Sequence, residues 1–318
     1  MNSLSPKEKS QLILIDGNAI LHRAFHALPE LTKNGEAVQA VYGFFSMLLR
    51  VVEDMKPEYL IVCFDRPKPT FRKQLYVGYQ AHRPSAPDGF GPQMEKVHQL
   101  LETMKVSIFE MDGYEADDVI GTLATQAANE SKEEIEVIIV TGDRDLMQLI
   151  GPRVKVLTPI VGLKETMLYD EAKVEEKFGI TPSQFVDYKA LIGDPSDGYP
   201  GVTGIGPKTA VTLLKEYKTF ENLYEHVGDL PEKIGMKLAT DAEQAALAKK
   251  LATIMTDVPV HLDLTTCACA SLDMIALKKG FEAVGFASLV KRIDLAVKAQ
   301  EAEAKRKEAE KNKQLGLL

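Results

Sequence analysis

Carboxylates follow the apolar segments in the first half of the chain at the points where those segments end. Asp16 comes directly after residues 12–15, and Asp65 comes directly after residues 59–64. A single carboxylate after a strand is most often a helix N-cap or a turn residue. The group is larger here, because the segments GYEADD, TGDRD and GDPSD contribute Glu115, Asp117, Asp118, Asp143, Asp145, Asp194 and Asp197.

These acids are typical of a site for hard divalent cations. Ligands of a parallel sheet bind outside the carboxyl ends of its strands, so the acids are expected at one edge, where their repulsion must be offset. Oxygen ligands suit Mg²⁺ or Mn²⁺, and no histidine or cysteine accompanies the acids, which argues against zinc. The pattern favours two-metal phosphoryl chemistry, in which paired ions activate water and stabilise the leaving oxygen.

A glycine-rich segment, PGVTGIGPKTA at residues 200–210, is a candidate phosphate-binding turn. Gly204 and Gly206 permit close backbone approach, and the following helix N-terminus, with Lys208 and Thr209, can bind an anion. The segment is not a Walker A loop, because a proline precedes the lysine. A tight turn between helices would also explain the glycines. A helix–turn–helix that binds a nucleic-acid backbone without reading bases fits the segment best.

Short apolar runs alternate with helical patterns in the part of the chain that must position the acids. Strands are predicted at 11–15, 59–64, 106–109, 136–140 and 154–157, and helices between them at 37–52, 93–105 and 115–129. This alternation predicts an α/β fold with a mainly parallel central sheet flanked by helices. From about residue 168 only helices are predicted, at 181–192, 207–217, 241–255 and 277–283, which indicates an all-helical subdomain.

Residues 66–92 differ from the rest of the first half. They contain five prolines and five basic residues, and they follow a predicted strand. A mobile surface loop is one interpretation of this segment. A basic lid over the strand's carboxyl end is the other.

Composition limits the classes of function. The chain has 318 residues, enough for one large domain or two small ones, and 38 basic against 46 acidic residues give a net charge of −8. This balance excludes a general basic coat for nucleic acid but not local basic patches. Three cysteines, Cys63, Cys267 and Cys269, argue against a disulfide framework. No apolar run approaches the roughly 18 residues of a membrane span, so a cytoplasmic protein that does not enter membranes is expected.

Taken together, the motifs resemble those of one family from about residue 12 to about residue 295. The chain resembles the 5′-nuclease (flap endonuclease) family, and most closely the 5′→3′ exonuclease domain of bacterial DNA polymerase I. The motifs that carry the resemblance are LIDGNAILHRAFHALP, AVYGFFSML, FDRPKPTFR, GYEADDVIGTLA, TGDRDLMQL and GDPSDGYPGVTGIGPKTA.

The resemblance implies an activity and a domain plan. It implies a PIN-like nuclease core at 11–167 with a basic helical arch at 66–92, a helical DNA-binding subdomain at 168–296 with a helix-hairpin-helix-like motif, and a charged tail at 297–318. The implied enzyme is a structure-specific 5′→3′ exonuclease and 5′-flap endonuclease in primer removal and DNA repair. Its substrates would be branched or nicked duplex DNA with a 5′ flap or RNA primer, and its products a 5′-phosphate and a 3′-hydroxyl.

The resemblance also implies the ligands of two Mg²⁺ ions, or of Mn²⁺. The expected metal ligands and catalytic acids are Asp16, Asp65, Glu115, Asp117, Asp118, Asp143, Asp145, Asp194 and Asp197. We expect Asp117, Asp143 and Asp145 in the first metal group, with Asp194 and Asp197 completing the second. Arg83 is expected as a further catalytic residue.

Two further sets of residues follow from the resemblance. The residues expected to contact DNA are Arg23, Arg72, Tyr79, Gln80, Arg83, Gly204, Gly206, Lys208 and Thr209. A K⁺ ion is expected on the backbone carbonyls of Leu191, Ile192, Pro200, Val202 and Ile205.

The sequence departs from the family pattern at two positions. Gln80 stands where the arch motif usually has a lysine, which would help to neutralise the scissile phosphate, whereas glutamine donates a hydrogen bond without charge. Gly198 replaces an asparagine, which predicts a local change of turn. Gln80 supports one alternative function, a non-catalytic, clamp-tethered module that binds DNA structures. The nine intact acids argue against that module, because it would gain nothing from negative charge near DNA.

The last five residues, QLGLL, resemble the short peptide by which bacterial replication proteins bind the sliding clamp. Gln314, Leu315, Leu317 and Leu318 are the expected contacts, presented by a charged linker. An incidental apolar end is the alternative. No polymerase domain follows in the sequence, so we expect a nuclease that stands alone and works beside a separate DNA polymerase.

Overall fold

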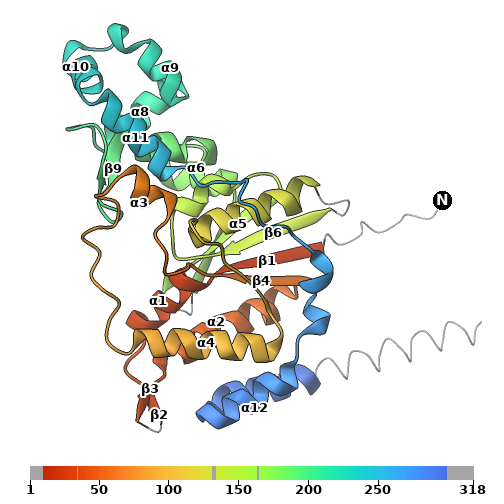
Figure 1. Ribbon diagram of the computed structural model, residues 1–318. Helices are drawn as coiled ribbons and strands as arrows, with labels where there is room; N and C mark the ends of the chain where they lie inside the picture. The colour runs from red at the N-terminus through yellow and green to blue at the C-terminus, as the bar shows by residue number, and fades with distance from the viewer. Residues whose placement is uncertain (1–9, 34, 131–133, 163–164, 299–318) are drawn as a thin grey trace, which may run out of the picture.

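The computed structural model describes residues 10–33, 35–130, 134–162 and 165–298 (Figure 1). Its centre is a six-stranded sheet with the order β5-β4-β1-β6-β7-β8. Neighbouring strands from β5 to β7 are parallel, and β8 is antiparallel to β7, so the predicted mainly parallel sheet is confirmed. The strands are β1 Ser10–Asp16, β4 Tyr59–Cys63, β5 Ser107–Phe109, β6 Ile135–Val140, β7 Val154–Val161 and β8 Glu165–Tyr169.

The central strands are apolar on both faces because helices cover both faces. In β1, Leu12 and Leu14 face one buried layer and Ile13 and Ile15 face the other, as the two-residue repeat of a strand requires. One layer is covered by α5 Ala116–Thr125, which continues into a π-helical turn. The opposite layer is covered by α1 Gly17–Ala27, α2 Gln39–Met55, α4 Phe90–Met104 and α12 Met274–Val284 (Figure 1).

A group of helices stands at one end of the sheet (Figure 1). Its apolar core is continuous with the α5 side of the sheet, because Leu191, Val202 and Leu214 belong to the same buried cluster as Val119 and Leu146. The helices are α6 Glu171–Phe178, α7 Phe185–Ile192, α8 Pro207–Tyr217, α9 Phe220–Glu225, α10 Glu232–Thr240 and α11 Ala242–Ala252.

Two short hairpins and one short helix complete the fold. β2 Thr32–Lys33 pairs with β3 Glu36–Ala37, and β9 Gly193–Asp194 pairs with β10 Tyr199–Pro200. The second hairpin lies between α7 and α8, within the half predicted to contain helices alone. The helix α3 Phe71–Leu75 begins the segment predicted as an arch.

The sheet extends further than its apolar runs suggest. β7 continues to residue 161 rather than ending at 157, and β8 adds an edge strand that was not predicted. β8 is missed because an edge strand can expose part of its surface, as Leu168 does, and so lacks a continuous apolar run.

The chain returns to the α/β core after α11. The amide of Leu60 donates to the carbonyl of Cys267, and α12 then packs Phe281 against Phe45 with ring centroids 5.2 Å apart. Arg292 fixes the end of this segment on α2 through Glu53. The range 168–296, predicted as one helical unit, therefore contains a stretch that packs with the α/β core; its predicted boundaries stay predictions.

No described helix is both long enough and apolar enough to cross a lipid bilayer.

Candidate metal centre and DNA-binding site

The first group of acids lies at the carboxyl ends of the three central strands. β4, β1 and β6 are adjacent and parallel, so the segments that follow them emerge at one edge of the sheet. Asp16 ends β1, Asp65 follows β4, and Asp143 follows β6, while Asp117 lies in the first turn of α5. The sequence prediction that these acids converge agrees with this topology.

Asp16 is held from both sides. Its Oδ1 accepts the amide of Ala19 at 2.9 Å and so caps α1, and its Oδ2 accepts the hydroxyl of Thr141 at 2.7 Å. Burial raises the pKa of Asp16 to about 7, assisted by the charges of Asp65 and Asp143 and opposed by the hydrogen bonds from Ala19 and Thr141. N-capping and membership of the acid cluster are thus combined in one residue.

Asp117 is buried and lies close to the negative charges of the other acids in this group. Burial raises its pKa, and the charges of Asp143, Asp16 and Asp65 raise it further. Asp65 is oriented by the amide of Ala116, which donates to its Oδ1 at 2.7 Å. A cation would remove this mutual repulsion.

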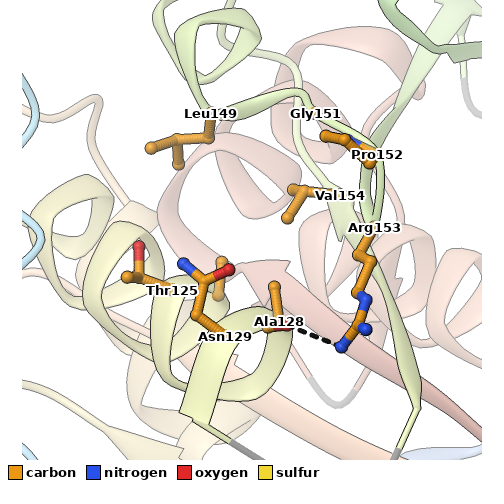
Figure 2. A pocket seen from close by; sticks show the side chains of 9 residues that line it. Thr125, Ala128, Asn129, Leu149, Gly151, Pro152, Arg153 and Val154 are labelled. Carbon is orange, nitrogen blue, oxygen red and sulfur yellow. Dashed lines mark hydrogen bonds between the residues drawn. The ribbon is translucent and has the colours of Figure 1, made fainter.

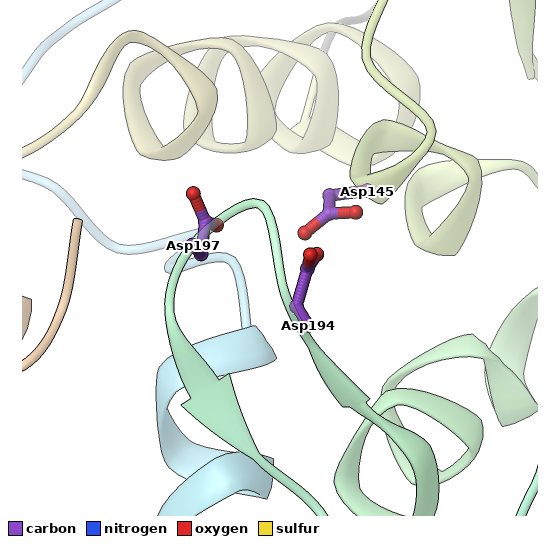
Figure 3. A group of neighbouring side chains, drawn as sticks. All are labelled: Asp145, Asp194 and Asp197. Carbon is purple, nitrogen blue, oxygen red and sulfur yellow. The ribbon is translucent and has the colours of Figure 1, made fainter. Parts of the chain in front are cut away.

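A second cluster consists of Asp145, Asp194 and Asp197. One carboxylate oxygen from each lies within 4.8 Å of the others (Figure 3). Asp145 begins a 3-10 turn after β6, whereas Asp194 and Asp197 come from the β9–β10 hairpin. The expectation that Asp145 joins Asp117 and Asp143 stays a prediction: the amide of Asp145 donates to Asp143 Oδ1 at 2.9 Å, so Asp145 lies beside the first group as well as in the second cluster.

The hairpin can form because two glycines let its flanks meet. A Cβ on Gly201 would lie 2.2 Å from the amide nitrogen of Gly193, and Gly193 itself has a φ of +74°. Gly198 has a φ of +76°, and its Cβ would lie 2.4 Å from the ring of His82. Glycine at 198 thus suits both the turn and the packing of residue 82 on it.

A buried lysine joins the second cluster. Lys189 of α7 donates from Nζ to Asp145 Oδ1 at 2.5 Å and also to Asp194. Burial and the charge of Asp143 raise the pKa of Asp145 to about 7, while Lys189 opposes the shift. Burial acts against ionisation of Asp194, but hydrogen bonds from Lys189 and Ser196 leave its pKa below the ordinary value. Reasoning from the acids alone missed Lys189; its place five residues before Asp194 was the available signal.

Arg72 and Asp118 form a buried ion pair instead of facing a ligand. Arg72 is 2% exposed and donates to both carboxylate oxygens of Asp118 at 2.7 Å. Asp118 also accepts the amides of Met255 and Glu115. The expectation that Arg72 contacts DNA is corrected, because its guanidinium is enclosed between α3, α5 and the end of α11. Asp118 is equally engaged and positions these elements rather than offering a free oxygen to a metal.

Residues 76–83 pack against the β9–β10 hairpin, which carries Asp194 and Asp197. The Tyr79 hydroxyl donates to Glu115 at 3.0 Å, the Gln80 side chain donates to Asp197 at 3.2 Å, and Arg83 pairs with the same Asp197 oxygen at 2.5 Å. The side chain of Arg83 is 49% exposed, whereas Tyr79 is buried and cannot contact DNA in this conformation. The rest of segment 66–92 runs along one side of the molecule between α3 and α4 (Figure 1).

The other predicted DNA contacts lie on two separate surfaces. Arg23 donates to the carbonyl of Ile160, within β7, and to that of Gly162, directly after β7. Gly204, Gly206 and Lys208 are exposed at the start of α8, where Thr209 lies in the first turn. The helix N-terminus there is open to an anion, as predicted for a backbone-binding turn.

The carbonyls predicted to bind K⁺ surround the same turn. The carbonyl of Leu191 accepts the amide of Val202 at 2.8 Å, and that of Val202 accepts the amide of Ile205. Ile192 ends α7 and Pro200 belongs to β10. The structure places these residues together around the turn, and the K⁺ ion stays a prediction.

A hollow of about 490 Å³ lies away from the acids, between the end of α5 and the start of β7 (Figure 2). Arg153 donates to the carbonyl of Ala128 at its edge, at 2.9 Å. Its lining contains no carboxylate, so it is not part of the metal centre.

Models of two domains of one family match the chain. The 5′-3′ exonuclease N-terminal resolvase-like domain matches residues 11–179, and the 5′-3′ exonuclease C-terminal SAM fold matches residues 180–274. The chain belongs to the 5′-3′ exonuclease family. This membership confirms the resemblance, the fold class and the predicted class of enzyme, a 5′ nuclease.

Relatives in the 5′-3′ exonuclease family include much longer proteins. The chain is 38% identical over 288 residues to DNA polymerase I of Bacillus subtilis (strain 168), which covers 90% of this chain and 32% of that protein. It is 39% identical over 288 residues to the thermostable DNA polymerase I of Thermus thermophilus. That match covers 90% of this chain and 33% of the polymerase. The chain thus spans about a third of the length of these curated relatives.

Solved structures share the fold of this member of the 5′-3′ exonuclease family. Bacteriophage T5 5′-exonuclease with bound zinc matches with a TM-score of 0.64 at 21% identity, over 86% of this chain and 98% of that one. The catalytic core of Rad2 in complex with DNA substrate matches with a TM-score of 0.57 at 15% identity. The match covers 87% of this chain and 88% of the Rad2 chain. At these identities the likeness concerns the fold.

Proposed function

We propose that this chain is a structure-specific 5′→3′ exonuclease and 5′-flap endonuclease that hydrolyses phosphodiesters of DNA and RNA primers, in primer removal and DNA repair. The observation that carries the proposal is the set of carboxylates at the ends of β1, β4 and β6 beside the β9–β10 hairpin. Such concentrated negative charge near a polyanion is useful only if cations neutralise it.

Divalent cations fit these residues. The ligand atoms on offer are carboxylate oxygens, which Mg²⁺ and Mn²⁺ prefer, and zinc-bound T5 5′-exonuclease supports metal dependence. We assign Asp16, Asp65, Glu115, Asp117 and Asp143 to one ion, and Asp145, Asp194 and Asp197 to the other. Two ions bound there supply activation of water and stabilisation of the leaving oxygen.

The chain's own cations and amides position the DNA. Arg83, half-exposed beside Asp197, is the residue we propose to contact the scissile phosphate, with Gln80 as a neutral donor. Lys208 and the open amides of α8 are proposed to bind the duplex backbone, since exposed helix N-termini bind phosphate. A K⁺ ion on the carbonyls between α7 and α8 would strengthen this contact.

Partners and location belong to the same proposal. The Rad2 core binds DNA substrate, which supports branched or nicked DNA as the partner here. A sliding clamp, a separate polymerase and a cytoplasmic location are proposed from the sequence. The peptide of Gln314, Leu315, Leu317 and Leu318 lies outside the described residues; its deletion should abolish clamp binding and leave cleavage intact.

The direct test is cleavage of a labelled 5′-flap duplex in Mg²⁺, with EDTA as the metal-free control. We expect cuts near the junction of single strand and duplex, lost in EDTA and lost in Asp143→Ala. Glu221→Gln, which alters an exposed carboxylate paired with Lys249, is the matched control and should cut normally.

Normal cleavage by Asp143→Ala would refute the metal assignment. Tight, structure-selective binding without any cleavage would favour the alternative of a non-catalytic, clamp-tethered module, and Gln80→Lys would then be the next variant to assay.

A further inference from the structure

The ammonium group of Lys189 lies between two of the three carboxylates of the second cluster. Its Nζ is 2.5 Å from Asp145 Oδ1 and also donates to Asp194. The same two acids share the 4.8 Å oxygen cluster with Asp197. The side chain is 15% exposed, so the contact is largely sheltered from water. A positive charge of the chain itself thus takes the place where a cation would neutralise these acids.

The lysine is well suited to this place. Burial alone would lower the pKa of Lys189, but Asp145 and Asp194 more than offset it and raise that pKa above the ordinary value. The contact is an ion pair between one ammonium and two carboxylates. It spares the folded protein the free-energy cost of an uncompensated buried carboxylate pair.

A second observation indicates that the cluster accommodates more than Lys189. Tyr199 is 3% exposed, and its hydroxyl has no hydrogen-bond partner among the described residues. Tyr199 pairs with Asp194 across the β9–β10 hairpin, so the phenol belongs to the element that carries two of the three acids. Buried hydroxyls without partners are uncommon and costly. A buried hydroxyl left without a partner in the hairpin that carries Asp194 and Asp197 is consistent with room for water there.

We propose that Lys189 is an internal cation that competes with a divalent ion for Asp145 and Asp194, so that the second metal site opens only when Lys189 moves aside. The flexible four-carbon stem of lysine permits this movement without displacing α7. The inference rests on the proposed function, because the divalent ion is that of the nuclease site.

The competition has a measurable size. An ion that binds only the open state has its apparent affinity reduced by the fraction of time the site is open. If Lys189 occupies the acids for about 90–99% of the time, the apparent Kd of the second ion is about 10- to 100-fold weaker than for the open site. Removal of the ammonium should recover that factor.

The test is Mn²⁺ binding to the full chain without DNA, with free Mn²⁺ counted by electron paramagnetic resonance. Lys189→Met should tighten the weaker class of Mn²⁺ site at least about tenfold. Lys189→Arg should not tighten it, because a guanidinium binds carboxylates at least as well. The matched control is Lys249→Met, since Lys249 also bridges two carboxylates, Asp187 at 2.7 Å and Glu221 at 2.6 Å, outside the cluster; it should leave Mn²⁺ affinity unchanged.

Thermal unfolding gives an independent readout. In EDTA, Lys189→Met should melt below the unmodified protein, because Asp145 and Asp194 lose their counter-ion. Saturating Mn²⁺ should then raise its Tm by more than it raises that of the unmodified protein, since tighter binding to the folded state stabilises more.

Unchanged or weaker Mn²⁺ binding by Lys189→Met would overturn the proposal and make Lys189 a positioning residue of the site. If Lys189→Met does not fold, Lys189→Arg decides: tighter binding by the arginine variant refutes the competition, and equal or weaker binding supports it. No outcome depends on DNA cleavage. Failure of the unmodified protein to cut a flap would therefore defeat the proposed function and leave this result standing.

Discussion

Asp16 and Asp145 are carboxylates that fold into surroundings opposed to their charge. Burial raises the pKa of each from 3.8 to about 7. Hydrogen bonds partly offset this, from Ala19 and Thr141 to Asp16 and from Lys189 to Asp145, but they do not restore the ordinary value. At the scale of single residues, the site stores electrostatic repulsion that a bound cation would release.

The raised pKa values predict the pH dependence of the metal-free protein. Between pH 3.8 and about 7 the folded state retains protons that the unfolded chain has released, so its free energy of unfolding falls as pH rises through this window. We expect a higher Tm in EDTA near pH 5 than near pH 8, measured by calorimetry. Asp16→Asn should flatten this dependence. A Tm that rises over the same range would show that these acids ionise freely in the fold.

We expect a large loss of stability when Arg72 is replaced. Arg72→Met leaves the fully buried Asp118 without its partner, and breaking a buried pair in this way costs about 3–5 kcal/mol. Urea unfolding measures the change. Arg66→Met is the matched control, because Arg66 pairs with Asp112 at the surface, where a pair contributes about 0–1 kcal/mol. Equal losses for the two variants would contradict the buried role of Arg72.

The β9–β10 hairpin is the element that completes the site. It carries Asp194 and Asp197 to Asp145, and its outer side holds Gln80 and Arg83 of the preceding segment. The acids follow each other closely in sequence, but their usefulness depends on the flanks of the hairpin meeting at Gly193 and Gly201.

Gly201→Ala should therefore damage the site through the backbone. Its Cβ would lie 2.2 Å from the amide nitrogen of Gly193, and backbone atoms cannot yield as a side chain would. We expect a lower Tm and at least about a tenfold weaker Mn²⁺ affinity, of the order seen when ligand-positioning groups are lost. Gly206→Ala, with open space around its Cβ, is the control. Unchanged metal binding in Gly201→Ala would show that the hairpin is not needed to assemble the acids.

At the scale of the whole molecule, the chain passes from the sheet to the helices and back to the sheet. The return places Phe281 in the buried layer under β1 and β4, beside Phe45 and Phe286. The helical group is therefore inserted between two parts of the α/β core, and its first and last residues both connect to that core. Residues near the end of the described chain complete the core.

Phe281→Ala should destabilise the entire nuclease core. The ring is fully buried, and loss of a buried Phe side chain costs about 3–5 kcal/mol. Denaturant unfolding followed by circular dichroism measures it. Ile275→Ala in the same helix is 68% exposed and should change stability by less than about 0.5 kcal/mol. A small effect of Phe281→Ala would mean that α12 is dispensable for the core.

The chemistry and the class of fold could be predicted from the amino-acid sequence. Alternating apolar runs predicted the strands, the acids after them predicted a cation site, and the glycines around residue 204 predicted an open helix N-terminus; these features depend on neighbours within a few positions. Three features could be seen only once the chain was folded: Asp145 lies with Asp194 and Asp197, Arg72 and Tyr79 turn inward, and Lys189 lies on the acids. All but one of those contacts join residues far apart in the chain. Examples are the hydrogen bond between Tyr79 and Glu115 and the one between Arg72 and Thr253. Lys189 and Asp194 are close in sequence, yet only the packing of α7 against the turn after β6 adds Asp145. Spacing along a chain constrains local geometry, whereas which distant charges meet is set by how the layers pack.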